Sequence, residues 1–190
     1  LQQYQLLDQE LDRHPLDGTT PDWVEAHNGR GVLPAGSGAA LEQRQLAERW
    51  QALTQQLKGL GECRRESHSL GGRSRPLLFA GDVQVVVQAG QLRPTGVMQG
   101  WLQHLLLCAG DAAPAGGSAV VARSTKVAGA AVELHWRPLA AAEAQPLLLQ
   151  LQDLAAWGLE RCWPIPPKSG WQLVWKEHNK AGSGLAGFTN

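Results

Sequence analysis

Cysteine is scarce in this chain. Three cysteines occur among 190 residues, at Cys63, Cys108 and Cys162, and no two of them stand at the short spacing of a metal-binding or redox pair. An odd number of widely separated cysteines argues against a disulfide scaffold and against a zinc site. We therefore expect a protein of a reducing compartment, the cytoplasm.

Net charge and long apolar runs are absent as well. The 17 basic and 17 acidic residues balance, so bulk charge neither attracts nor repels a polyanion, and a nucleic-acid contact has to be local. The longest apolar run, residues 102–109, contains His104 and is too short to cross a membrane. No signal peptide is visible, and we expect no membrane association. Because the chain begins with Leu1 and ends at Asn190, we also expect a piece of a longer protein.

Residues 83–88 carry the clearest strand pattern. Valines at 83, 85 and 87 alternate with Gln84 and Gln88, which is typical of a strand with one face in the core and one face nearer solvent. We expect Ala89-Gly90 to turn the chain and Leu92-Arg93 to form a short return strand. Pro94 would end that strand, because proline cannot donate to a sheet ladder.

A buried helix is predicted directly after this strand. From Val97 to Cys108 the apolar residues, among them Trp101 and Leu102, recur at helical spacing. Thr95 is the predicted N-cap, and Gly110 the predicted end.

The rest of the chain predicts an α/β fold, a mixed β-sheet flanked by helices. Helices are expected over residues 1–13, 39–58 (capped by Ser37 and ended by Gly59) and 140–159, with a short helix possible after Thr20-Pro21. Strands are expected over 76–80, 118–123 and 131–137, and polar loops over 16–38 and 61–75. The first of these strands either ends at Ala80 or continues through Gly81-Asp82 into residues 83–88. Three prolines in residues 163–175 predict an extended approach to a last helix from Gly170. We divide the chain into a helical lead-in, residues 1–74, and an α/β core with a C-terminal helix, residues 75–190.

The strand-to-helix unit resembles part of the restriction-endonuclease-like nuclease fold. In that superfamily an acid on one strand and an acid-x-Lys triplet on the next hold Mg²⁺ and activate water, and the second strand leads into a helix. Here the expected second strand reads Gln91-Leu92-Arg93-Pro94, without acid or lysine, and Asp82 is the only carboxylate in or beside the first strand. The resemblance therefore implies a nuclease-like fold that lacks its catalytic residues.

Three motifs in order resemble the C-terminal region of the gamma chain of exodeoxyribonuclease V, the RecC family. They are QGWLQHL at residues 99–105 with Cys108-Ala109, then RPLA at residues 137–140, then PIPPKSGW at residues 164–171. The sequence LPAG at residues 33–36 also resembles that family. The likeness spans nearly the whole chain, and is weakest over residues 111–131 and after Trp175.

The resemblance implies a subunit of an ATP-dependent helicase–nuclease that acts in double-strand break repair and homologous recombination. Its partners would be DNA and the beta and alpha chains of the complex. The resemblance implies no catalytic residue and no metal or cofactor in this chain, because ATP and Mg²⁺ chemistry would belong to the partner subunits.

The basic residues of 61–75 are the candidate nucleic-acid contacts. Arginines there outnumber the two glutamates, and phosphate contacts need little besides Lys or Arg. A solvated surface loop is the competing interpretation. The candidates are Arg64, Arg65, Arg73 and Arg75.

Other residues that could bind a metal ion or stack on bases have simpler structural interpretations. Asp82 beside Gly81 is more typical of a turn than of a metal site. His104 and Cys108, four residues apart on a helix, lack a third ligand and favour a packed pair. Trp101, Trp157, Trp171 and Trp175 are phased with leucines, which indicates the core and not base stacking.

Two further functions stay open. An active Mg²⁺-dependent nuclease would need acids from elsewhere, for example Asp82 with Glu133, although no lysine follows Glu133 at the required spacing. A protein-interaction module without DNA contact is the other alternative.

Overall fold

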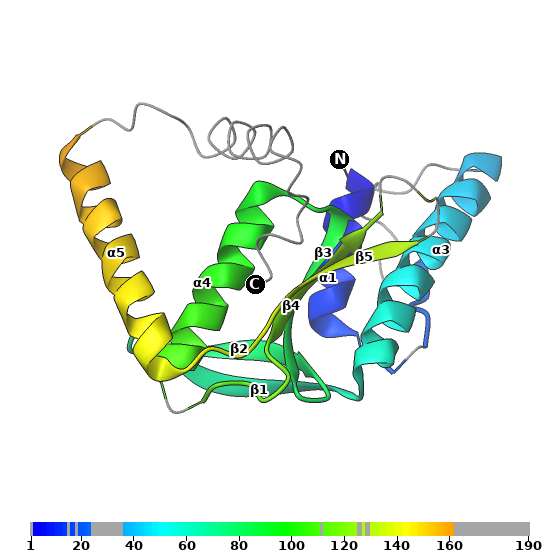
Figure 1. The fold of residues 1–190 in the computed structure, drawn as a ribbon. Coiled ribbons are helices and arrows are strands. Elements are labelled where there is room, and N and C mark those ends of the chain that lie inside the picture. The colour runs from blue at the N-terminus through cyan, green and yellow to red at the C-terminus, as the bar shows by residue number, and fades with distance from the viewer. Residues whose placement is uncertain are drawn as a thin grey trace.

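The structure is a computed structural model that describes residues 2–14, 16–17, 19–23, 36–110, 112–124, 127 and 130–161. In this part of the chain four helices surround a five-stranded sheet (Figure 1). The elements are α1 (Gln2–Arg13), α3 (Ser37–Leu60), β1 (Cys63–Leu70), β2 (Arg73–Ala80), β3 (Val83–Gln91), α4 (Pro94–Ala109), β4 (Ser118–Arg123), β5 (Ala131–Trp136) and α5 (Ala141–Glu160).

The sheet is mixed, and its strands lie in sequence order from β1 to β5. The pairs β1–β2, β2–β3 and β4–β5 are antiparallel, whereas β3 and β4 are parallel. A parallel pair needs a crossover connection, and α4 supplies it. The predicted mixed sheet flanked by helices is confirmed.

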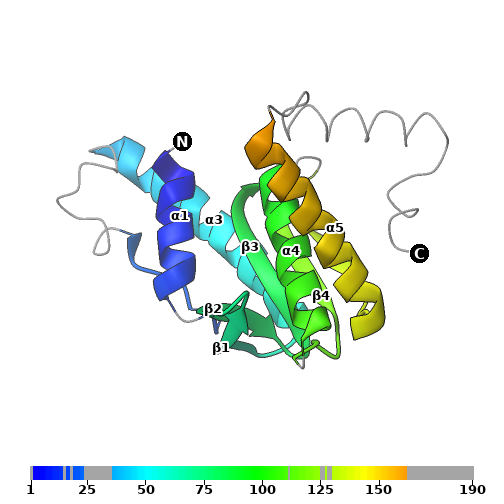
Figure 2. The ribbon, with the colours of Figure 1, turned by 90° about the vertical axis from the view of Figure 1, so that its left-hand side faces the viewer.

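Helices cover both faces of the sheet (Figures 1 and 2). On one face, α1 and α3 pack against the alternate residues of β3 and β4 that include Val85 and Val121, and Trp50 is fully buried there. On the other face, α4 lies on the sheet and α5 lies on α4. Leu105, Cys108 and Ala144 form the buried contact between these two helices. The predicted stripe of α3 is thus buried against the sheet, whereas the predicted stripe of α5 is only partly covered by α4.

The first correction concerns residues 61–75, which were predicted as a loop. They contain β1, a tight turn and the start of β2. Gly71 and Gly72 both have positive φ, 57° and 78°, which the favoured two-residue hairpin turn requires and glycine readily adopts. The prediction failed because β1 is an edge strand, polar on most of its length, and gives little period-2 hydrophobic signal.

The second correction concerns residues 89–93. Ala89-Gly90 makes no turn, and Leu92-Arg93 forms no return strand; β3 instead continues to Gln91 and leads straight into α4. The reason is tertiary, since β4 pairs alongside β3 as far as Gln91, with an irregularity in the register after Gln88. The hairpin partner of β3 is β2, which precedes it.

Three predicted helix ends are also wrong. Gly36, not Ser37, is the N-cap of α3, and Gly61, not Gly59, is its C-cap. Arg93 occupies the N-cap of α4 in place of Thr95, and Pro94 takes the first turn. Proline suits that position because the first amides of a helix have no partner within the helix. The end at Gly110, the strands over 118–123 and 131–137 and the helix over 140–159 are confirmed to within one residue.

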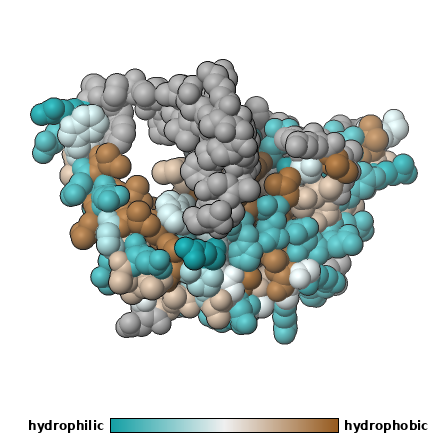
Figure 3. Space-filling model, viewed as in Figure 1, coloured by the Kyte–Doolittle hydropathy of each residue, from teal (hydrophilic) through white to brown (hydrophobic). Residues whose placement is uncertain are grey.

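Burial departs from the sequence pattern at a few positions. Gln84 was placed nearer solvent, but it is fully buried against α4, while Leu102 is 45% exposed and Trp157 is 39% exposed. Exposed apolar side chains gather along α5, where Figure 3 shows brown surface. No described helix has the length and apolar character that a membrane span needs.

Some predictions lie outside the described residues. These are the short helix expected after Pro21, beyond Trp23, and the segment over 163–175 with Trp171 and Trp175. The division at residues 74 and 75 stays a prediction; β2 crosses that position.

Candidate nucleic-acid interface

The hairpin formed by β1 and β2 carries all four candidate arginines. The cross-strand register pairs Arg64 with Phe79, His68 with Arg75, and Leu70 with Arg73. Because paired residues share a face of the sheet, Arg64, Arg73 and Arg75 lie on the face that meets α4. Arg65 lies on the opposite face. The structure therefore brings three of the four arginines to one side and separates the fourth.

The inner part of this hairpin is anchored to the body of the domain. Leu70, Leu77 and Phe79 are buried together with Leu107 of α4. Burying apolar side chains contributes about 1.5–3 kcal/mol each. The hairpin is thereby held in one orientation, which fixes where its exposed arginines lie.

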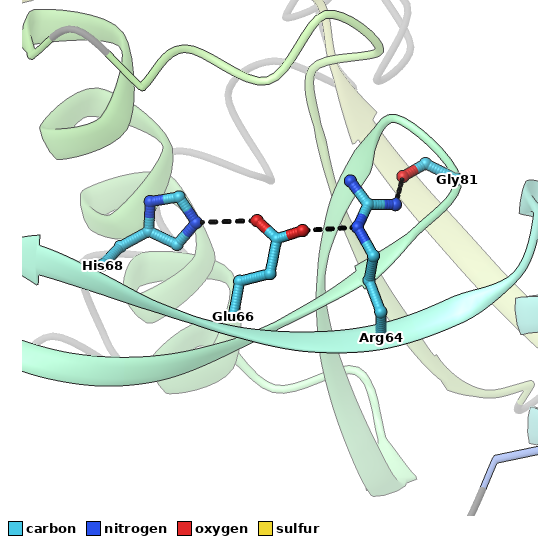
Figure 4. Close-up of polar contacts among 4 residues, drawn as sticks. All are labelled: Arg64, Glu66, His68 and Gly81. Carbon is cyan, nitrogen blue, oxygen red and sulfur yellow. Dashed lines mark hydrogen bonds and ion pairs between the residues drawn. The ribbon is translucent and has the colours of Figure 1, made fainter.

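Arg64 is engaged by its neighbours (Figure 4). Its Nε lies 2.5 Å from the Glu66 carboxylate, and its Nη1 donates to the Gly81 carbonyl. Its guanidinium also lies 5.4 Å from the centre of the Phe79 ring. His68 contacts the other Glu66 oxygen at 3.2 Å. The hydrogen bonds from Arg64 and His68 lower the pKa of Glu66. This carboxylate therefore stays charged and partly neutralises the basic face.

Arg65 is bound on the other side of the hairpin. Its guanidinium donates to the carbonyl of Leu11, near the end of α1. This bond satisfies one of the last carbonyls of a helix, which have no partner within the helix. Arg65 therefore has a clear structural role in joining α1 to β1.

Arg73 and Arg75 lie next to the hairpin turn, and both are exposed. Pro76 and the two turn glycines are exposed beside them. A twisted hairpin tip with exposed guanidinium groups can reach phosphate oxygens without moving the domain core. Of the four candidates, these two are the best placed for that contact.

A cleft opens where β2 and β3 separate. The two strands pair only from Leu78 to Ala80 and from Val83 to Val85, and beyond this fork a hollow of about 530 Å³ follows β3. We call it the β3 cleft; its polar lining is Asp8, Asp12, Arg65, Gln84, Gln99 and Gln103.

Apart from Arg65, sequence reasoning missed the polar residues of the β3 cleft. Gln84 donates through Nε2 to Gln103 Oε1 at 3.0 Å, while its own Oε1 is buried with no partner in the described part of the chain. Asp8 Oδ1 accepts the N–H of Ala89 at 3.2 Å. The available signal was the glutamine inside a valine-rich strand, although the sequence alone does not place it beside a helix.

Loss of water against β3 is the main cause of a raised pKa at Asp8. The hydrogen bond from Ala89 opposes the rise, nearby Asp12 reinforces it, and Arg93 opposes it. Asp8 is thus an exposed residue at the margin of the cleft whose carboxylate has lost part of its water to β3.

His104 and Cys108 form a packed pair, as predicted. Both are buried, with Sγ of Cys108 3.7 Å from the imidazole nitrogens of His104. His104 Nδ1 lies 2.9 Å from Ser118 Oγ, and its ring stacks on Trp101 with the centroids 5.4 Å apart. Burial lowers the pKa of His104, which keeps the imidazole neutral, and raises the pKa of the Cys108 thiol.

The carboxylates suggested for an active nuclease lie apart. Asp82 is in the β2–β3 turn, as expected for an acid beside a turn glycine, and its carbonyl accepts the N–H of Gly116. Glu133 lies on β5 and bonds Gln56 at 3.0 Å. The register of β3, β4 and β5 places Glu133 level with Val87, five residues beyond Asp82, which separates the two acids by about 17 Å along the strands, with β4 between. Among the described residues no group of three His, Cys, Asp or Glu is arranged to hold a metal ion.

These features define a mixed α/β domain whose edge hairpin presents arginines beside an open cleft. The chain belongs to the RecC C-terminal domain family, whose model matches residues 1–178. RecC is the gamma chain of exodeoxyribonuclease V, a multi-subunit helicase–nuclease that binds DNA, and membership ties the chain to DNA repair and recombination. No curated protein matches the chain.

Proposed function

We propose that this domain is a non-catalytic scaffold and DNA-handling module of the exodeoxyribonuclease V gamma chain. Its partners are DNA and the beta and alpha chains, it acts in the cytoplasm, and ATP and Mg²⁺ are used by the partner subunits. Membership of the RecC C-terminal domain family supports the assignment to this helicase–nuclease complex. The observation that carries the DNA-handling role is the anchored hairpin with Arg73 and Arg75 exposed at its tip.

The non-catalytic part of the proposal is supported by the two strands that precede α4. The strand that leads into a helix is β3, and the strand before it is β2. In the nuclease motif these two strands carry the acids and the lysine, yet neither β2 (RSRPLLFA) nor β3 (VQVVVQAGQ) contains Asp, Glu or Lys. Gln84 of β3 faces α4, but its neutral amide oxygen is a weaker Mg²⁺ ligand than a carboxylate.

The four arginines differ in the interactions that they already make within the domain, and we rank their expected contributions to DNA affinity accordingly. Arg65 is joined to α1 and Arg64 to Glu66 and Gly81, so using either for DNA would cost an existing interaction. Arg73 and Arg75 carry no such cost in the described structure. We expect them to supply most of the affinity of the hairpin.

Fluorescence anisotropy with a forked DNA duplex tests the proposal. The full-length protein is titrated at low and moderate salt, and a Mg²⁺ cleavage assay is run on the same sample. The expected result is salt-sensitive binding without cleavage. The double variant Arg73→Ala with Arg75→Ala should lower the slope of log affinity against log salt by about 2, since each phosphate contact contributes roughly one.

Arg44→Ala is the matched control. Arg44 is exposed on the first half of α3, well away from the hairpin, so its loss should leave the salt slope unchanged. Equal effects of the control and the double variant would overturn the hairpin assignment, and absence of binding would favour an interaction module. Mg²⁺-dependent cleavage by the pure protein would overturn the non-catalytic assignment.

A further inference from the structure

One edge of β3 has an incomplete partner. β4 runs beside β3 from Gln84 to Gln91, but β2 pairs with it only as far as Val85. Beyond Val85, no described strand lies along the β2 side of β3. An unpaired strand edge presents a row of backbone donors and acceptors that another chain can bind.

The hydrogen bonds show which amides face this edge. Gln84 donates its N–H to Gly117, on the β4 side, whereas Ala89 donates its N–H to Asp8, on the open side. Backbone groups alternate between the two sides of a strand, so Val87 and Ala89 face the open edge. Asp8 occupies the place that a carbonyl of a neighbouring strand would take.

Space for a further strand lies along the same edge. The β3 cleft of about 530 Å³ is continued by a second hollow of about 280 Å³, and both are lined by Asp8, Val87 and Gln99. Neighbouring strands lie about 4.8 Å apart. A single extended segment can therefore lie between α1 and α4 without displacing the buried core.

The backbone groups and charges along the open edge of β3 indicate which kind of molecule could bind there. A regular row of amide and carbonyl groups is matched by an extended peptide backbone, the binding mode known as strand addition. Asp8 and Asp12 on the α1 side disfavour a polyanion such as a DNA strand, while Arg65 on the same cleft already donates to Leu11. A peptide that takes the Ala89 N–H releases the Asp8 carboxylate to pair with a basic side chain.

We propose that β3 is a strand acceptor, in which its open edge at Val87 and Ala89 binds an extended segment of a partner subunit with a basic residue opposite Asp8. The acceptor site itself is inferred from the geometry of the β3 edge. The identification of the bound segment as part of another subunit rests on the proposed function.

Amide hydrogen exchange in the full-length gamma chain, free and in the DNA-free complex, tests the site. The exchange of Val87 and Ala89 is expected to slow at least tenfold on assembly. Gln99→Trp fills the cleft from α4 and should remove this protection. Met98→Trp, on the exposed neighbouring position that does not line the cleft, should leave it in place.

A photo-crosslinker at position 99 identifies the occupant. Crosslinks to an extended segment of another subunit that carries Lys or Arg support the proposal. Crosslinks only to DNA, or only to residues 162–190 of the same chain, overturn it. Unchanged exchange in an intact complex also overturns the acceptor site but leaves the scaffold role standing, whereas failure of the subunits to assemble overturns both.

Discussion

Gly100 of α4 lies directly against Val120 of β4. A Cβ atom added to Gly100 would stand 2.6 Å from Val120 Cγ2 and 3.0 Å from the ring of Trp136. Real Cβ atoms do not approach so closely, and both neighbours are confined by the sheet and by α4. The glycine therefore sets the distance between the crossover helix and the parallel strand pair.

We expect Gly100→Ala to destabilise the domain by about 1–3 kcal/mol, because the extra methyl group overpacks this contact. Gly59→Ala is the matched control: it lies inside α3 with nothing within 4 Å of the added Cβ, and should stabilise by up to about 1 kcal/mol. Urea unfolding of the three proteins measures the difference. Equal stability of the Gly100→Ala variant and the parent would show that the helix can move away at no cost.

Acid should destabilise the domain through His104. Its pKa is lowered in the folded state by burial, so the unfolded chain takes up a proton more readily. This contribution to stability is complete above the ordinary value of 6.5 and is lost as pH falls from there towards the folded pKa.

His104→Gln should abolish that loss, while His68→Gln on the hairpin should retain it. Thermal unfolding measured between about pH 7.5 and 5 follows the effect. A parent protein whose stability does not change with pH in this interval would contradict the assignment of a neutral, buried imidazole.

Asp8 should make the domain more stable as pH falls, which is opposite to the effect of His104. Its raised pKa means that the folded state binds a proton more readily than the unfolded state. Stability therefore rises as pH falls through the folded pKa towards the ordinary value of 3.8, and Asp8→Asn should remove this increase. Urea unfolding across that range measures it, against Gln9→Ala on the exposed neighbouring position of α1.

Near neutral pH the bond from Ala89 to Asp8 can be tested by itself. Asp8→Ala leaves that amide without its acceptor and should cost about 1 kcal/mol, while Asp8→Asn keeps an acceptor oxygen and should cost less. If the two variants are equally stable, water satisfies the edge amide as well as the side chain does.

Glu66 should restrain DNA binding by the hairpin. Its carboxylate stays charged between Arg64 and His68, so Glu66→Gln removes a negative charge from the basic face and frees Arg64. We expect affinity for the forked duplex to rise on the order of twofold at low salt, with a smaller gain at high salt. Anisotropy titrations measure it, with Glu48→Gln on α3 as the control; a fall in affinity would indicate that Glu66 positions Arg64 for DNA.

Local signals in the sequence determined the helices and the two later strands. The apolar stripes of α3 and α4 follow the helical period and become largely buried faces, as Leu46 and Leu105 illustrate, whereas Leu154 and Trp157 of the α5 stripe stay exposed. Gly110 ends α4, and the short apolar run around Val120 gives β4, which is buried on both faces. The lack of Asp, Glu and Lys in residues 73–80 and 83–91 is also plain in the sequence, but only the structure shows that these residues are the two strands before α4.

Only the tertiary structure decided the pairing and the site. Whether Gly90 turns the chain depends on β4 lying beside β3, and Gln84 is buried because α4 covers it. The separation of Arg65 from the other arginines follows from strand register, and the β3 cleft exists because β2 leaves β3 at Val85. These are contacts between residues far apart in sequence, so no local period or propensity encodes them.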